Sequence, residues 1–531
     1  MASDAAASGF RDPAFLQRRA ARANEERRWQ EAIQLCTLGL NRLPGPALEA
    51  ALCLERARAL LERRELARAD ADCRRSLALC RSVDAQVLLA RCLLESGAPA
   101  AALPELESTL ECDPESGSAW TLKARALLAA GQPDAAVAAA ERAAVLAPST
   151  LTFGLRLSAL SAAGRHDEVM ALAEARLGSG AFDAELWVSL GLSCNARGRS
   201  ARAIEAFERA LALAPERIDA NFGLGVALCR QGDFAQGFRY LEHRQKDVGK
   251  AFRFGIAPWR GEALAGKSVF VWSEQGLGDI IQFARFVPIL RRAAAHLSFF
   301  VPSTLVRLFE SAPGLSGTLA SGHPGFGTAD YQTLLLSLPH LLSASDLGLR
   351  EASEPYLLPE RELVDQWRAR LPAGPTIALA WQGNPKYAGE PWRSIPFAEF
   401  APLLQQYGAA ARFVSLQKNF GAEQLRASPV HHRVLDFDSE LDGGADAFVD
   451  SAALLSLVDL LITTDTSLVH LAGALGTPTW LLLSDVADWR WGGEVETTIW
   501  YPSVRLFRQR VPGNWRTVVQ RVCAELGALL T

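Results

Sequence analysis

The sequence predicts an all-α repeat array followed by an α/β region made of two parallel-sheet lobes. In the first half, loop glycines recur at intervals of 34, 33, 34 and 34 residues, at Gly97, Gly131, Gly164, Gly198 and Gly232. From Gly266 onward, short apolar runs alternate with helical stretches, a pattern typical of a parallel sheet with helices on both faces. The change of period therefore divides the chain into two structural classes.

Composition excludes several classes of protein. The chain has 531 residues, enough for about three or four domains. Its formal charge of −4 argues against nucleic acid as the main partner, which demands a basic face. No apolar run approaches the length of a membrane span, and no secretory signal is visible, so we expect a cytoplasmic protein. The nine cysteines form no Cys-x-x-Cys pair and are interpreted as reduced thiols without a metal.

The first half carries the pattern of tetratricopeptide repeats, which place two antiparallel helices in each 34 residues. The unit that starts at Glu185 matches it at Trp187, Leu190, Gly191, Ala203, Phe207, Ala210 and Pro215. Backward extrapolation puts Arg63 and Trp29 where loop glycines would stand, so the array spans 14–245 with seven helix pairs. Such superhelices present a concave surface that binds a protein or peptide; a rigid spacer or a dimerisation arm is the alternative.

The second half divides into a linker (246–265), an N-terminal lobe (266–371) and a C-terminal lobe (372–531) that ends in a closing helix from Asn514 to Leu530. The sequence LPAGP, Leu371–Pro375, reads as the connection between the lobes. Strands are predicted at 267–272, 297–301, 333–336, 376–381, 412–416, 459–463 and 479–483.

The most informative segment is Leu460–Leu483, which reads as strand, loop, helix, turn and strand. Asp465, Thr466 and Ser467 stand at the carboxyl end of its first strand, where ligands of parallel sheets bind. The next helix presents free N–H groups there, and a helix N-terminus favours phosphate. The segment therefore predicts a site for nucleotide phosphates.

A second glycine loop, Gly276-Leu277-Gly278, follows a strand and opens a helix, as phosphate-binding loops do. Ile281 stands where a dinucleotide fingerprint would have its third glycine, which argues against a dehydrogenase. Asp279 lies at the start of this helix. It is either an N-cap that accepts backbone N–H groups or a general base at the mouth of a cleft.

Four motifs are similar to bacterial glycosyltransferases of the GT-B fold, in particular the heptosyltransferase-like (family 9-like) type. Over residues 255–520 these are EQGLGDIIQFARFVPIL, AWQGNPKYAGEPWRSIP, FVSLQK, and DSAALLSLVDLLITTDTSLVHLAGALGTPTWLLL followed by DWRW. Joined to the repeats, the chain resembles the tetratricopeptide glycosyltransferases that modify proteins, including enzymes that decorate flagellin and the O-GlcNAc transferases. The resemblance implies a GT-B fold with two Rossmann-like lobes.

It also implies an inverting glycosyl transfer from a nucleotide-sugar held mainly by the C-terminal lobe, without a metal or other cofactor. Asp279 would be the base that deprotonates the acceptor. Asp465, Thr466 and Ser467 would hold the donor diphosphate. His470 would contact phosphate or ribose, with a buried histidine hydrogen-bonded to backbone as the alternative. Gly276 and Gly278 belong to the same donor site.

The leaving diphosphate needs positive charge, and Lys418 and Arg393 are the candidates because both stand near the ends of predicted elements. Both can equally be solvated basic residues. Gln382 and Asn384, at the end of the strand 376–381, are candidates to contact the base or phosphates. Trp489 and Trp491 could stack on a nucleobase, although core packing is favoured. Asp450 is expected to cap the helix that follows it, and Asp436-Phe437-Asp438 to be a solvated acidic loop rather than a metal site.

The leading hypothesis is thus a glycosyltransferase whose repeats recruit a protein acceptor, such as flagellin or another surface protein, and whose lobes modify its Ser/Thr residues or an attached glycan. The first alternative is a protein-binding scaffold with a degenerate transferase module. The second is another GT-B activity, such as a sugar epimerase or a phosphorylase.

Overall fold

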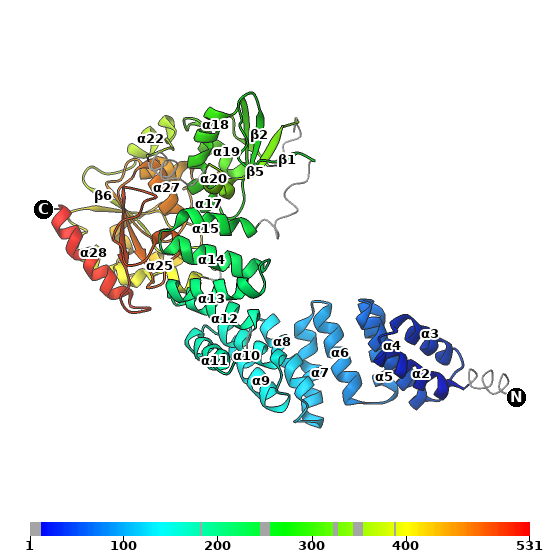
Figure 1. Cartoon of the computed structure of the whole chain (residues 1–531). Coiled ribbons are helices and arrows are strands. Elements are labelled where there is room, and N and C mark those ends of the chain that lie inside the picture. The colour runs from blue at the N-terminus through cyan, green and yellow to red at the C-terminus, as the bar shows by residue number, and fades with distance from the viewer. Residues whose placement is uncertain are drawn as a thin grey trace. The chain divides into compact units, whose positions relative to one another are not determined.

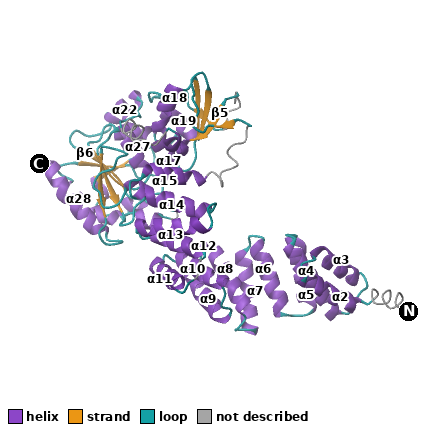
Figure 2. Cartoon of the chain, viewed as in Figure 1, coloured by secondary structure: helices purple, strands orange, loops and turns teal. Residues whose placement is uncertain are grey.

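The computed structural model describes residues 12–180, 183–244, 255–321, 328–342, 354–386 and 389–530. The chain forms two compact units, Met1–Ser193 and Cys194–Thr531. The first contains repeat helices alone, whereas the second contains the last repeats and both sheets (Figures 1 and 2). Residues 246–254 of the predicted linker, 246–265, lie outside the described residues.

Antiparallel helix pairs build the array. Within the described residues there are the seven expected pairs: α2 (Pro13–Glu25) and α3 (Trp29–Leu40), α4 (Pro46–Glu62) and α5 (Leu66–Leu79), α6 (Val83–Glu95) and α7 (Pro99–Cys112), α8 (Gly117–Ala129) and α9 (Pro133–Leu146), α10 (Thr150–Ala162) and α11 (His166–Gly178), α12 (Ala184–Ala196) and α13 (Ser200–Leu213), and α14 (Ile218–Arg230) and α15 (Phe234–Leu241). The fourteen helices confirm the predicted repeat architecture.

The loop glycines serve the turn inside each pair. Gly97, Gly131, Gly164, Gly198 and Gly232 all have φ between 69° and 88°, a left-handed conformation that favours glycine. In the two earliest pairs this conformation is held by Arg64 (φ 62°) and Arg27 (φ 56°). The extrapolated positions Arg63 and Trp29 were therefore wrong by one and two residues, because the early helices do not keep the 34-residue period.

The cysteines are free thiols. Six of the eight that precede residue 230 are buried, whereas Cys80 and Cys112 are exposed. Within the part of the chain that the structure describes, no helix is both long and apolar enough to cross a membrane.

The first sheet is fully parallel, with the strand order β1-β5-β2-β3-β4. Its strands are β1 (Ala257–Pro258), β2 (Ser268–Trp272), β3 (His296–Val301), β4 (Leu319–Ala320) and β5 (Tyr331–Leu334). The chain moves outward from β2 to β3 and β4, then returns to the other side of β2 as β5. The order reverses beside β2, and in such sheets the crevice at the reversal binds ligands. The loop to α17 (Leu277–Phe283) leaves from this point.

The second sheet is also parallel, with the order β11-β10-β9-β6-β7-β8. Its strands are β6 (Thr376–Ala380), β7 (Arg412–Ser415), β8 (Val434–Asp436), β9 (Leu460–Thr464), β10 (Thr479–Leu483) and β11 (Val504–Arg508). Numbered within the lobe, this order is 3-2-1-4-5-6, that of a dinucleotide-binding sheet. The reversal lies between β6 and β9, and α27 (Ser467–Leu475) starts just beyond β9. The predicted fold class, helical repeats followed by two Rossmann-like lobes of the GT-B type, is confirmed.

Helices connect the strands. They are α17, α18 (Val287–Ala293), α19 (Ser303–Glu310) and α20 (Leu338–Leu341) in the first lobe, with α22 (Arg361–Arg368), α23 (Glu390–Arg393), α24 (Ala401–Tyr407), α25 (Ala422–Arg426), α26 (Val449–Leu455), α27 and α28 (Trp515–Leu530) after it. Two short 3₁₀ helices, η1 (Glu242–Arg244) and η6 (Trp489–Trp491), contribute residues to the candidate site. Helix α28 is the predicted closing helix.

One apolar core joins the last repeat to both lobes. Phe238 and Leu241 of α15 belong to the same buried cluster as Phe283 of α17 and Trp489 of η6. The rings of Phe238 and Trp489 meet edge-to-face, with centroids 5.7 Å apart. The last helix pair of the array is thus packed into the α/β region as part of one folded unit.

Candidate functional site

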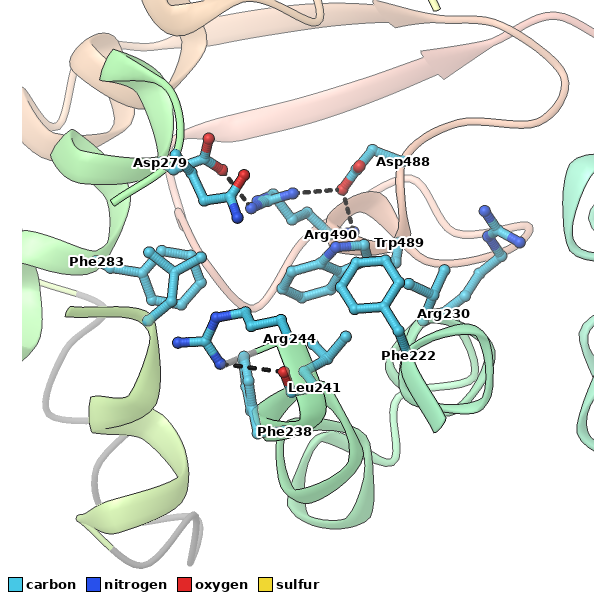
Figure 3. Close-up of a pocket in the computed structure, with 13 residues that line it drawn as sticks. Phe222, Arg230, Phe238, Leu241, Arg244, Asp279, Phe283, Asp488, Trp489 and Arg490 are labelled. Carbon is cyan, nitrogen blue, oxygen red and sulfur yellow. Dashed lines mark hydrogen bonds and ion pairs between the residues drawn. The ribbon is translucent and has the colours of Figure 1, made fainter. Parts of the chain in front are cut away.

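A cavity of about 350 Å³ opens where the last repeat meets the two lobes (Figure 3). Its apolar wall comes from α14 and α15, through Phe222, Val226, Phe238 and Leu241. Phe222 is 42% exposed and lies at the solvent side of this wall. The opposite wall comes from α17 and the segment Asp488–Arg490; it carries the charged groups of Asp279, Asp488 and Arg490 beside the rings of Phe283 and Trp489, and is called the polar wall. Repeat and lobes together form this cavity.

Asp279 lies on the polar wall. Strand β2 ends at Trp272, Gln275 turns the chain with φ at 66°, and Gly276 is the N-cap of α17. The Oδ2 atom of Asp279 accepts a hydrogen bond from the Gly276 N–H at 2.9 Å. Asp279 is therefore not the N-cap itself but the third residue of α17, and its side chain accepts the backbone N–H of the N-cap, Gly276. The same side chain also lines the cavity, which is the place that the general-base alternative requires.

Arg490 joins the lobes beside Asp279. Its Nη2 donates to Asp279 Oδ1 at 2.5 Å, its Nε to Gln282 Oε1 at 2.6 Å and its Nη1 to Asp488 Oδ1 at 2.8 Å. Burial alone would lower the pKa of Arg490, but the Asp488 and Asp279 carboxylates raise it above its ordinary value. The guanidinium is therefore a fixed cation at the polar wall.

The N-terminus of α27 forms the second part of the site. Thr466 is its N-cap, but no side chain caps the helix, and the Thr466 hydroxyl is buried without a hydrogen-bond partner. Arg393 Nη1 donates to the backbone oxygen of Asp465 at 2.8 Å, so a guanidinium stands beside the loop. Backbone N–H groups, the positive end of a helix dipole and an arginine are the chemistry that holds phosphate.

Asp465 and His470 have strongly perturbed environments. Burial, and next the charge of Asp488, raises the pKa of the Asp465 carboxyl to about 6. Burial, followed by the charges of Arg490 and Arg285, holds the pKa of His470 well below its ordinary value. His470 Nδ1 is 3.0 Å from the Tyr501 hydroxyl. His470 is thus a buried, hydrogen-bonded histidine, as the alternative expected, but its partner is a side chain and not the backbone.

The first turns of α17 and α27 touch each other. A Cβ atom added at Gly278 would lie 3.1 Å from His470 Cδ2 and 3.2 Å from the Cα and Oγ atoms of Ser467. This close approach needs glycine. The structure thereby brings Gly276, Gly278 and Asp279 of one lobe together with the loop Asp465–Ser467 and His470 of the other.

The remaining predicted site residues have other contacts. Gln382 Oε1 accepts from Gln424 Nε2 at 2.7 Å, and Asn384 Oδ1 accepts from the Lys386 N–H at 3.0 Å in its own exposed turn. Lys418 Nζ donates to the backbone oxygens of Leu441 and Asp442 and so fastens a loop. These bonds do not join Lys418 to the loop at α27, and its role in catalysis stays a prediction.

Three further predictions, on the Asp436–Asp438 loop, on metal binding and on Asp450, can be compared with the structure. Arg426 forms ion pairs with both Asp436 and Asp438, at 3.0 and 2.6 Å. Among the described residues, no group of three or more His, Cys, Asp or Glu side chains could hold a metal ion. The expectation that Asp450 caps α26 was wrong. Asp442 accepts from the Asp450 N–H at 2.8 Å, because a loop aspartate reaches the helix start from outside.

Trp489 and Trp491 are buried, 8% and 1% exposed, so core packing is the better interpretation for both. Arg490 and Asp488 are the site residues that sequence reasoning missed. The available signal was an acidic and a basic residue two positions apart in a motif already identified.

Comparisons with known proteins agree with the repeats. Tetratricopeptide repeat models match residues 93–151, 156–218 and 195–242. Protein FlbA of Caulobacter vibrioides is 28% identical over 435 residues, which cover 69% of this chain and 71% of FlbA. A family 9 glycosyl transferase from Veillonella parvula is a similar solved structure, at 14% identity and a TM-score of 0.37, covering 50% of this chain and 97% of that one. A tetratricopeptide repeat protein from Parabacteroides merdae is similar at 13% identity and a TM-score of 0.38, covering 46% of this chain and 94% of that one.

Proposed function

We propose that the protein transfers a glycosyl group from a nucleotide-sugar to a Ser/Thr hydroxyl, or to a glycan, of a protein acceptor bound by the repeats. The observation that carries this proposal is the position of Asp279. It lines a cavity walled by the last repeat, and its helix touches the first turn of α27. One carboxylate thus adjoins both a surface suited to a peptide and a surface suited to a diphosphate.

The donor side rests on the topology of the second sheet. The loop Asp465–Ser467 follows β9 at the reversal of a 3-2-1-4-5-6 sheet, where nucleotides bind in such folds. The uncapped N–H groups of α27 and the nearby Arg393 supply the positive potential that a leaving nucleoside diphosphate requires.

The acceptor side rests on the cavity wall. A peptide that follows the repeats to their end would place its apolar side chains against Phe222, Val226 and Phe238. A hydroxyl carried by that peptide would then face the carboxylate of Asp279. In the proposed step the hydroxyl oxygen attacks the anomeric carbon of the donor sugar. The bond from that carbon to the diphosphate oxygen breaks, the hydroxyl proton passes to Asp279, and the configuration inverts.

The test uses the full-length protein and the variant Asp279→Asn. Calorimetry against a panel of nucleotide-sugars identifies the donor, and mass spectrometry of proteins retained by Asp279→Asn, before and after addition of wild-type enzyme and donor, identifies the acceptor and the added mass. We expect Asp279→Asn to lose at least about 10²-fold in turnover while donor affinity changes little. Arg393→Ala should weaken donor binding instead.

Asp365→Asn, an exposed carboxylate on α22, is the matched control and should behave as wild type. Unchanged turnover of Asp279→Asn would remove this residue from the mechanism. Failure of every donor to bind would favour the scaffold, and conversion of a donor without any acceptor would favour an epimerase or another GT-B activity.

A further inference from the structure

Three side-chain hydrogen bonds fix the orientation of the Arg490 guanidinium. Two of its bonds go to Asp279 and Gln282, which lie three residues apart on one face of α17. The third goes to Asp488 of its own loop. Its carbon centre also lies over the Trp489 ring, 4.4 Å from the centroid. A planar guanidinium with fixed donors suits this task, and a lysine ammonium does not.

The bonds to Asp279 constrain the carboxylate from both sides. Its Oδ2 accepts the Gly276 N–H, and its Oδ1 accepts Arg490 Nη2. With one bond on each oxygen, the carboxylate plane is fixed, and a lone pair stays available for a hydroxyl in the cavity. A base whose direction is set before the acceptor arrives needs no reorganisation during the reaction.

The charges around Arg490 come from several elements. Asp488 and Asp279 pair with it directly, and Asp465 acts on it from the loop before α27. Arg230 of α14 and Arg244 of η1 line the same cavity. Arg244 is paired with Glu274, and the neutral His470 adds no charge. The cation that directly faces the Asp279 carboxylate across the lobe boundary is therefore Arg490.

We propose that Arg490 is a positioning residue: from the C-terminal lobe it orients and charge-stabilises the Asp279 carboxylate across the boundary between the two lobes. Asp488 and Gln282 orient Arg490 in turn. This inference rests on the proposed function, since it assigns a helper to the base named there. It predicts that the second lobe, which holds the donor, also completes the acceptor side.

The experiment compares Arg490→Gln, Arg490→Lys and a matched control, Arg508→Gln, in the full-length protein. Arg508 is a half-buried arginine of the same lobe whose Nη2 donates to the backbone oxygens of Trp491 and Gly492, so its loss disturbs the same turn without touching Asp279. The measurements are kcat, KM for the acceptor, donor affinity by calorimetry, and thermal stability.

We expect Arg490→Gln to lower kcat roughly 10²-fold with donor affinity within about threefold of wild type. Arg490→Lys should restore part of kcat. Arg508→Gln should lower thermal stability while kcat stays near that of wild type.

Two results would overturn the inference. An Arg490→Gln enzyme with normal kcat would show that the ion pair is structural, as would kinetics that match those of Arg508→Gln. A loss of donor affinity with kcat preserved would instead make Arg490 a donor ligand. Either result can occur while Asp279→Asn is inactive, in which case the proposed function stands. If Asp279→Asn is fully active, the proposed base fails first.

Discussion

Gly278 of the first lobe lies directly against Ser467 of the second, at a distance that leaves little room for a methyl group. The Cβ atom of an alanine at Gly278 would come within 3.2 Å of the Ser467 Cα atom. That neighbour is backbone and cannot rotate away. The contact sets the spacing between the N-termini of α17 and α27, and with it the distance between the candidate base and the candidate phosphate loop.

Gly278→Ala should therefore separate the two helices by a few tenths of an ångström and lower kcat/KM by about tenfold, with a loss of stability of about 1 kcal/mol. Steady-state kinetics and urea unfolding measure the two effects. Gly444→Ala in the same unit is the control, because an added Cβ there would meet nothing within 4 Å. Wild-type kinetics for Gly278→Ala would mean that the helices can part freely.

Gly473 gives a test of packing within the second lobe. A Cβ atom added there would lie 2.2 Å from the Tyr501 ring, which is itself buried and bonded to His470. Gly473→Ala should lower the free energy of unfolding by about 1–3 kcal/mol through overpacking. Gly154→Ala should do the reverse and stabilise its helix by up to about 1 kcal/mol, since the added Cβ there meets nothing within 4 Å. Equal effects from the two substitutions would contradict the packing argument.

The fold was predictable where its signal is local. A left-handed turn favours glycine, so the regular spacing of the glycines from Gly97 to Gly232 predicted the repeat array. Strand β10 was predicted at its observed bounds, because TWLLL is buried throughout. The short strand β1, which pairs only with β5, was missed because its two residues carry no apolar run. Strand β11 was missed because Arg505 and Arg508 interrupt its pattern on an edge of the sheet.

The site was predictable only in part for the same reason. Each glycine or Asp-Thr-Ser loop is a local pattern, and each was found. The bond from Arg490 to Asp279 joins residues 211 positions apart, and no periodicity relates them. The wall formed by Phe222 and Phe238 depends on how the last repeat packs against the lobes, which composition and spacing do not specify.

Asp465 should make stability depend on pH. Its pKa of about 6 in the folded protein lies above the value of about 3.9 for an unfolded chain, so the folded state binds this proton more tightly. The contribution to stability is therefore full below about pH 4 and is lost as the pH rises to about 6. Asp465→Asn cannot ionise, so its free energy of unfolding should rise relative to that of wild type by up to about 3 kcal/mol between pH 4 and pH 7.

Urea unfolding of both proteins at the two pH values measures this difference, and comparison with wild type cancels the titration of all other groups. A gap between Asp465→Asn and wild type that stays constant from pH 4 to pH 7 would show that the carboxyl group is already ionised, as an exposed aspartate would be.

The ion pair between Arg244 and Glu274 offers a last test, of how the repeat is fastened to the first lobe. Arg244 Nη2 lies 2.5 Å from Glu274 Oε1, both side chains are 7% exposed, and Ser337 accepts a further bond from the same nitrogen at 3.0 Å. Arg244→Met leaves the Glu274 carboxylate buried without its cation, so it should cost about 3–5 kcal/mol of unfolding free energy.

The double variant Arg244→Met, Glu274→Met should recover most of this loss, because two apolar side chains leave no buried charge. Arg239→Met, an exposed arginine of α15, should stay within about 0.5 kcal/mol of wild type. If the double variant is less stable than Arg244→Met alone, the pair contributes more than charge compensation, and the repeat is held to the lobe by this bond rather than by the aromatic core beneath it.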